Sequence, residues 1–495
     1  MFRHLRYTTS FVTIGAAFVA TSLSAADPLD DFYGPDQVQE VQLRIADADV
    51  QLMIQALPER IYVPASFRWR DTEVAKVAVR FKGNSSSNRQ APFKRSYLIK
   101  FDEYDKEARF FGLRRVSFDN GIQFGSLFSE PIVTEILRAE GIVTQRANYA
   151  RLFVNGDYRG VYVNVERIDE SFIVSHLPDP DGSLFKCDEG GPGCNLQFIG
   201  DNRTNYKKAF EPKAGTSKKD KDRLIEFIKM INQAPPEEFA ERIGVELELD
   251  DFLRTTAVLL FAGAFDQLTG WNPHNYYLYR DNERNRWRYL PWDLDVGFSE
   301  TAFGRIKVLE HWHAAWPVPR SGSHNPLMER IINNPDVLRR YRREARRILD
   351  EHFEPERLTT ILDATYALIK QDLQNDPFPH RRATSRHEED YDQIVASIKD
   401  FIRKRYATAR QQLAEPGERP KRVHPPQGPP PQLAAKVRQL QEGARGVQQN
   451  GGDFAPIEKL MRQIGPLLQR QKNQEAEKLI DQALELIDEE LGDAR

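Results

Sequence analysis

The feature that most limits how this chain can fold is a change of hydrophobic period along its length. From Val38 to about Gly112, runs such as VQLRIAD and VAKVAVRFKG alternate apolar and polar residues, which is typical of half-buried strands. After Asn325, apolar residues recur at helical spacing through three long segments that end near Leu413. A β-rich first part followed by a helical last part predicts an α+β fold.

Local signals predict the elements between these two parts. The segment FSEPIVTEILRAEGI predicts a helix with Ser129 as its N-cap and Gly141 at its end. Asn155-Gly156 stands between two apolar runs, which is the strongest short signal for a β-hairpin. Further along, KDKDRLIEFIKMINQ and LDDFLRTTAVLLFAGAF predict helices, and NYYLYRD and RWRYLPWDLD predict two strands.

The two ends of the chain differ from the middle. Residues 1–26 carry arginines, then the apolar run Phe11 to Val19, then small residues, which predicts a secretory signal peptide and an exported protein. The apolar run is shorter than the roughly 20 residues that a membrane-spanning helix needs, and no later segment qualifies. At the other end, residues 415–432 predict a Pro-rich linker, and residues 433–495 predict a small helical appendage.

The chain contains two cysteines, Cys187 and Cys194, within CDEGGPGC. Export favours oxidation and the glycines permit a tight loop, so we predict a disulfide between them rather than a metal site. The formal net charge of −3 gives no basic field, which argues against nucleic acid as a partner.

Acidic side chains gather around the predicted strand pair. Asp266 follows the buried helix, Asn275 precedes the first strand, and Asp293 and Asp295 follow the second strand. Phosphoryl transfer needs such a set: one carboxylate faces the acceptor hydroxyl, while an Asn and a second carboxylate hold Mg²⁺ on the phosphates of a nucleotide such as ATP. Asp295 is either a further metal ligand or a helix N-cap.

The first part of the chain offers complementary groups. Lys100 lies inside the predicted strand KRSYLIKFD, and the following helix carries Glu130 and Glu135, either of which could pair with such a lysine. The segment from Gly83 through Asn84 and Ser85 to Asn88 predicts a polar loop whose backbone N–H groups could cover phosphates. Taken singly, each feature is more often structural than functional.

Four motifs in this order resemble the spore coat protein H (CotH) kinase family: RFKGNSS with KRSYLIKFD, LFVNGDYRGVYVNVERID, HNYYLYRD and YLPWDLDVGF. The resemblance covers about Val38 to Leu413. It implies an atypical kinase-like domain over residues 36–414, with a β-rich lobe over about 36–168 and a helical lobe over about 169–414. It also implies Mg-ATP-dependent phosphorylation of a secreted or coat protein.

Carried over by motif, the resemblance implies that Asp266 is the catalytic Asp and Asp293 the metal-binding Asp. Asn275 matches the Asn of the first strand, although eight residues separate it from Asp266, against four in an ordinary kinase loop, so Asn272 is a rival. Lys94 and Lys100 match two basic positions, of which one contacts phosphate. The chain has neither His-Arg-Asp nor Asp-Phe-Gly at these places.

Three functions therefore compete. The first is an exported kinase-like phosphotransferase acting on a protein acceptor. The second is a binding or structural module of the cell surface that keeps the fold and the cation site without transfer. The third is a hydrolase that uses Asp266 and Asp293 as an acid–base pair.

Overall fold

The computed structural model describes most of the chain from Asp27 onward. The described residues are 27–83, 87, 94–121, 127–187, 190–270, 273–302, 306–316, 325–378, 390–417, 431–450, 452–469 and 472–492. The predicted signal peptide, loop residues Asn84 and Ser85, the rival Asn272 and most of the predicted linker lie outside them.

Seven strands close into a barrel in the order β1-β2-β3-β4-β5-β7-β6, with β1 parallel to β6 and every other pair antiparallel. The strands are β1 (Val38–Ile45), β2 (Val63–Trp69), β3 (Thr72–Lys82), β4 (Ser96–Lys100), β5 (Arg115–Asp119), β6 (Ala147–Val154) and β7 (Asp157–Glu166). Strand side chains such as Phe67 form a core of their own together with Phe101 and Phe110, which lie between β4 and β5. The barrel confirms the β-rich first part and leaves no open sheet edge.

The predicted hairpin is present between β6 and β7. Asn155 and Gly156 both have a positive φ, 55° and 89°, which is the left-handed conformation that a two-residue hairpin turn needs. The Asn155 side chain also accepts a 2.8 Å hydrogen bond from the Ile45 N–H, so the turn is held against the end of β1.

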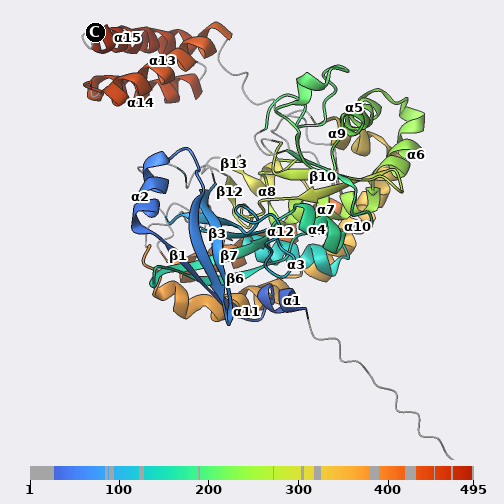
Figure 1. The fold of residues 1–495 in the computed structure, drawn as a ribbon. Coiled ribbons are helices and arrows are strands. Elements are labelled where there is room, and N and C mark those ends of the chain that lie inside the picture. Colours follow the sequence, from blue (N-terminus) through green and yellow to red (C-terminus); the bar gives the residue numbers. More distant parts are fainter. Residues whose placement is uncertain are drawn as a thin grey trace, which may run out of the picture.

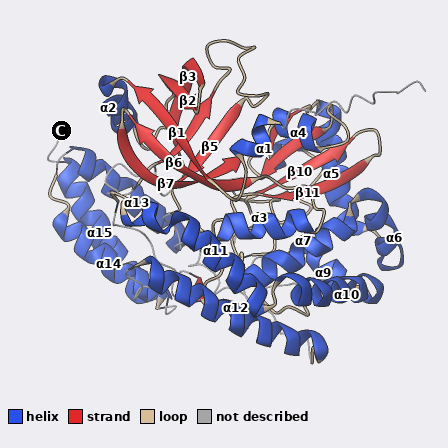
Figure 2. Ribbon diagram, turned by 90° about the horizontal axis from the view of Figure 1, so that it is seen from below, coloured by secondary structure: helices blue, strands red, loops and turns tan. Residues whose placement is uncertain are grey.

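A second sheet has the strand order β11-β10-β8-β9, and helices lie against both sheets. Its strands are β8 (Ser183–Cys187), β9 (Glu211–Ala214), β10 (Tyr276–Asp281) and β11 (Arg286–Pro291). The long helices are α3 (Ser129–Ala139), α5 (Lys218–Gln233), α6 (Pro236–Glu246), α7 (Leu249–Ala262), α9 (Pro326–Asn333), α10 (Pro335–His352), α11 (Pro355–Gln374) and α12 (Tyr391–Ala414). Figure 2 shows α3, α7 and α9 to α12 gathered on one side of the two sheets, which confirms the α+β class.

Short elements complete this part of the chain (Figure 1). They are α1 (Pro28–Phe32), α2 (Asp47–Ala56), α4 (Glu170–His176), the 3₁₀ turn η2 (Arg203–Tyr206), β12 (Thr301–Ala302), β13 (Ile306–Lys307) and α8 (Val308–His311). Within the described part of the chain, no helix has both the length and the apolar character to cross a bilayer.

Two local predictions need correction. Ser129 is the first residue of α3 rather than its N-cap, which is Phe128, and its hydroxyl is buried against the turn at Gly297. The helix does stop before Gly141, which has a φ of 70°. The predicted disulfide is wrong: the structure does not bond the two buried cysteines, because Cys187 ends β8 facing the Pro273 carbonyl while the Cys194 thiol faces the Ala209 carbonyl at 3.5 Å.

The last three helices pack on one another around a separate core. They are α13 (Pro431–Asn450), α14 (Ala455–Gln469) and α15 (Asn473–Gly492), and Leu440, Ile457 and Ile480 are among their buried residues. Three helices thus follow the predicted linker.

We predict that proteolysis within Arg419 to Gln432 releases α13 to α15 without unfolding the rest, because the three helices have their own core. All six tryptophans precede residue 317, so tryptophan fluorescence reports only on the remaining part and should not change on cleavage. An earlier cut inside residues 38–413, or a fluorescence change on release, would contradict the boundary.

Candidate functional site

A cleft of about 360 Å³ lies where the barrel meets the second sheet. It is lined by acidic and basic residues from both. The acidic residues are Asp119, Asp266, Asp293 and Asp295, and the basic residues are Arg60, Arg80, Lys82, Arg167 and Lys186. The structure therefore brings together Asp266, Asn275, Asp293 and Asp295, which the sequence predicted as one site, and adds Gly83 from the end of β3.

Asp266 is placed by the turn after α7. That helix ends at Gly263 in the left-handed conformation, and the chain then turns back toward β10. The Asn275 side-chain amide donates to the Asp266 backbone oxygen at 3.1 Å and to its Oδ2 at 3.2 Å, while His274 Nε2 lies 3.5 Å from Oδ2. Asn275 thus orients the carboxylate of Asp266.

Asp293 sits two residues beyond the end of β11. Two hydrogen bonds fix the backbone of its turn. The Trp292 N–H donates to the Asn275 backbone carbonyl at 2.9 Å, and Gln267 Nε2 donates to the Trp292 backbone carbonyl at 2.7 Å. Asp293 has a φ of 59°, a conformation that Asp and Asn tolerate better than most residues and that is frequent at functional sites. The sequence did not indicate a role for Gln267. Its side chain binds the backbone beside Asp293, and only the folded structure brings the two segments together.

The carboxylates of the cleft crowd one another. Burial raises the pKa of Asp266 to about 6, with Asp293 adding to the rise and His274 opposing it. Burial also raises the pKa of Asp295 well above its ordinary value, reinforced by Asp293 and Glu130. Unscreened like charges in a partly dry cleft favour either a bound proton or a bound cation.

The carboxylates of the cleft suit Mg²⁺ bound together with phosphate better than they suit a metal ion whose ligands all come from the protein. In the described part of the chain, the only three metal-binding side chains with ligand atoms all within 4.8 Å of one another are Glu140, Glu351 and His352, outside the cleft. Mg²⁺ keeps several waters and takes only one or two carboxylates together with phosphate oxygens. Asp293, with Asp295 or Asn275, would supply that number.

The basic side of the cleft depends on a lysine that sequence reasoning missed. Lys82, at the end of β3, pairs with Asp119 and donates to Ser117 Oγ at 2.9 Å, with its ammonium 5.8 Å from the centre of the Trp292 ring. In the sequence, Lys82 lies in RFKG, directly before the loop predicted to cover phosphates. Its position next to Gly83 could therefore have indicated a role at the site.

The two lysines chosen from the sequence lie elsewhere. Lys94 is buried, pairs with Asp376 at 2.7 Å, and donates to the Val161 carbonyl, which leaves its ammonium enclosed. Lys100 pairs with Glu103 at 2.5 Å. Neither lines the cleft.

The two glutamates of α3 lie in different places. Glu135 lines a different hollow near Asp36, and burial together with Asp36 raises its pKa. Glu130, the alternative, is buried beside the cleft, where burial raises its pKa to about 8 and Asp119 and Asp293 add to the rise. Lys82 opposes that rise, so Glu130 is the α3 glutamate that a charged group in the cleft would sense.

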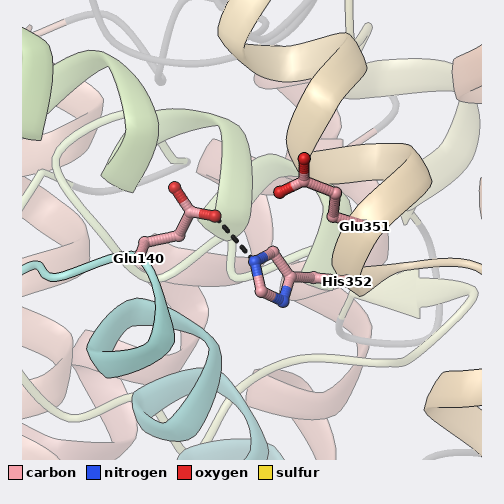
Figure 3. A group of neighbouring side chains, drawn as sticks. All are labelled: Glu140, Glu351 and His352. Carbon is pink, nitrogen blue, oxygen red and sulfur yellow. Dashed lines mark hydrogen bonds and ion pairs between the residues drawn. The ribbon is translucent and has the colours of Figure 1, made fainter.

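The Glu140, Glu351 and His352 group is an ion network rather than a metal site (Figure 3). The Glu140 carboxylate already accepts hydrogen bonds from Arg347 Nη1 at 3.0 Å and His352 Nε2 at 2.6 Å. Arg254 Nη1 lies 3.7 Å from Glu140 Oε2, the oxygen that Arg347 Nη2 also binds. Two guanidinium groups would repel a metal ion, so these residues join α3 to α7 and α10 instead.

Comparison with known proteins gives one consistent answer. Inner spore coat protein H of Bacillus subtilis is 25% identical over 309 residues, which cover 62% of this chain and 81% of that protein. Spore coat protein homolog 1 of Rhizopus delemar is 24% identical over 257 residues, which cover 50% of this chain and 40% of that protein. A family model described as CotH kinase protein matches residues 79–409, which include the motifs around Lys82, Asp266 and Asp293. The chain belongs to the CotH kinase family.

Proposed function

We propose that this protein is an exported, kinase-like phosphotransferase that uses Mg-ATP to phosphorylate a protein acceptor. The observation that carries the proposal is the cleft: crowded carboxylates face Lys82, Arg167 and Lys186 in one space of about 360 Å³. Negative groups for a metal beside positive groups for phosphates are what phosphoryl transfer requires. Family membership supports the same chemistry and a two-lobed, kinase-like arrangement of the barrel and the helical part.

Each residue then has a distinct task. Asp293 would hold Mg²⁺ with help from Asp295 or Asn275, and the metal would neutralise charge on the phosphates of the nucleotide. Lys82 and Arg167 would contact phosphate oxygens. Asp266, oriented by Asn275, would align the acceptor hydroxyl and accept its proton as the acceptor oxygen bonds to phosphorus and the nucleotide leaves.

The competing function is a binding module that retains the cation site without transfer. Calorimetric titration of the full chain with ATP, with and without Mg²⁺, followed by an assay for phosphate incorporation, separates the two. Mg-dependent binding with incorporation into the chain itself or into an acceptor supports the kinase. Binding without incorporation favours the module, and no nucleotide binding overturns the proposal.

Lys82 provides a sharper test of the nucleotide site. We expect Lys82→Met to weaken Mg-ATP binding by roughly tenfold or more, because a phosphate would lose a charged hydrogen-bond donor. Lys100→Met is the matched control, since Lys100 is also a strand lysine with an acidic partner but lies outside the cleft. Equal affinity of the two variants, measured by calorimetry, would remove Lys82 from the site.

A further inference from the structure

A second hollow, of about 760 Å³, lies between α5, α6 and the β10–β11 hairpin. It is separate from the cleft: Arg280, which lines it, is five residues along β10 from Asn275, or about 17 Å at the usual rise of a strand. Four cationic side chains and two acidic ones line it, and three of the cations already have ion-pair partners: Arg223 pairs with Asp220, Lys229 with Asp201, and Arg242 with Glu238 and Glu246. The cations are Arg223, Lys229, Arg242 and Arg280, and the acids are Glu226 and Glu246.

Arg280 is the unusual member of this group. Arg280 lies in β10 and is only 9% exposed. Its guanidinium group nevertheless forms no ion pair with any carboxylate in the described part of the chain. It donates one hydrogen bond, from Nη2 to Asn285 Oδ1 at 2.9 Å, and its buried Nε has no partner. Burying an arginine in this way costs free energy unless an anion compensates it.

The other cations do not relieve this cost. Arg223 adds repulsion, and together with burial it lowers the pKa of Arg280, while Asp220, Glu246 and Glu226 oppose the shift from beyond ion-pairing distance. Arg223 has its own partner, Asp220, at 3.1 Å. Arg280 therefore keeps its charge beside the hollow without a carboxylate to compensate it. Its Nε is enclosed, so Nη1, which makes no hydrogen bond within the described residues, is the atom that an anion in the hollow could reach.

Apolar side chains form the smaller part of the lining. The Arg280 guanidinium lies 5.5 Å from the centre of the Trp287 ring, which stacks on Phe227 with ring centres 5.3 Å apart. Met230 adds to the lining, and at the rim Val245 is 64% exposed, one of the few large apolar side chains so exposed. A volume of this size and character suits several residues of a peptide better than an isolated ion.

We propose that this hollow binds an acidic segment of a partner polypeptide, whose carboxylate or phosphorylated side chain pairs with Arg280 while a neighbouring apolar side chain packs on Val245. A carboxylate and a phosphate both match the fork of a guanidinium group, so either can be the anion. Docking here is independent of whether phosphate is transferred at the cleft.

The test uses the full chain and fluorescein-labelled peptides read by fluorescence anisotropy. The probes are a repeating Glu-Leu peptide, the same peptide with every Glu replaced by Gln, and one with a single phosphoserine in place of a Glu. We expect the acidic peptide to bind, the Gln peptide to fail, and Arg280→Met to weaken acidic binding by about thirtyfold or more. Tighter binding of the phosphoserine peptide would identify a phosphorylated partner, and tighter binding of the Glu peptide a carboxylate.

Two controls keep the outcome decisive. Arg203→Met removes the same charge from an exposed pair with Asp222 outside the hollow and should leave the affinity within about twofold of the wild type. The unfolding midpoint of Arg280→Met should stay equal or rise, because an unpaired buried charge is removed. Equal peptide affinity in Arg280→Met, a clear fall in its unfolding midpoint, or binding of the Gln peptide as well as the Glu peptide would overturn the proposal.

Discussion

Asp293→Asn is expected to remove Mg-dependent nucleotide binding and, with it, phosphate transfer. The substitution keeps the size of the side chain and replaces a charged metal ligand by a neutral one, which a divalent ion binds far more weakly. Asparagine also tolerates the φ of 59° at this position, so the turn held by Gln267 should survive. Calorimetric titration with Mg-ATP measures the loss.

Asp266→Asn should give the opposite pattern and serves as the matched variant. Asp266 is assigned to the acceptor hydroxyl, so nucleotide affinity should stay close to wild type while turnover falls by roughly 10²- to 10⁴-fold. Both variants must keep the wild-type melting temperature without ligand to within a few degrees. If Asp293→Asn binds Mg-ATP as well as the wild type, Asp293 is not the metal ligand and its turn is structural.

The sequence predicted elements well where the signal was local. The Asn155-Gly156 hairpin, the stop at Gly141 and the long helices after Asn325 depend on neighbouring residues, and all are present. The closure of the barrel could not be predicted from the sequence, because it depends on β1 pairing with β6, which lies more than a hundred residues later. No local pattern encodes such a pairing.

The candidate site divides in the same way. The acids around WDLD were found because they directly follow a strand, and the structure places them in one cleft with Asp266. The sequence left Lys94 and Lys100 as alternatives for the phosphate contact, and of Lys82, Lys94 and Lys100 the structure places only Lys82 in the lining of the cleft. Only tertiary packing shows that Asp376, at the far end of α11, encloses Lys94. The same holds for Cys187 and Cys194, whose sequence proximity says nothing about the direction of their side chains.

The largest effect on stability is expected at Glu140. This carboxylate, only 3% exposed, follows α3 and accepts a hydrogen bond from His352 of α10 (Figure 3). It also accepts hydrogen bonds from Arg347 of α10, and Arg254 of α7 lies near. Glu140→Gln keeps the shape but removes the buried negative charge that Arg347 and Arg254 share. Arg347 then keeps only its more exposed partner Glu351 and the neighbouring Glu344, and Arg254 keeps Asp251. We expect a loss of roughly 3 kcal/mol in the free energy of unfolding, the lower end for a broken buried pair because Arg347 is partly exposed.

Glu351→Gln is the control from the same network. Glu351 pairs with Arg347 at 2.6 Å, but its side chain is 51% exposed, so its removal should cost less than about 1 kcal/mol. Urea unfolding followed by tryptophan fluorescence measures both variants without interference from α13 to α15. Equal losses in the two variants would mean that burial of Glu140 does not matter.

Acid provides an independent check on the same carboxylate. Burial alone would raise the pKa of Glu140, but the hydrogen bonds from Arg347 and His352 outweigh it and lower the pKa below its ordinary value. A carboxyl whose folded pKa is depressed stabilises the protein above the pKa it has when unfolded, about 4.3, and this contribution disappears as pH falls through the folded pKa. The difference in the free energy of unfolding between the wild type and Glu140→Gln should therefore have its largest value near pH 7. It should decrease progressively below about pH 4. A difference that stays constant down to pH 3 would show that Glu140 acts through packing rather than through its charge.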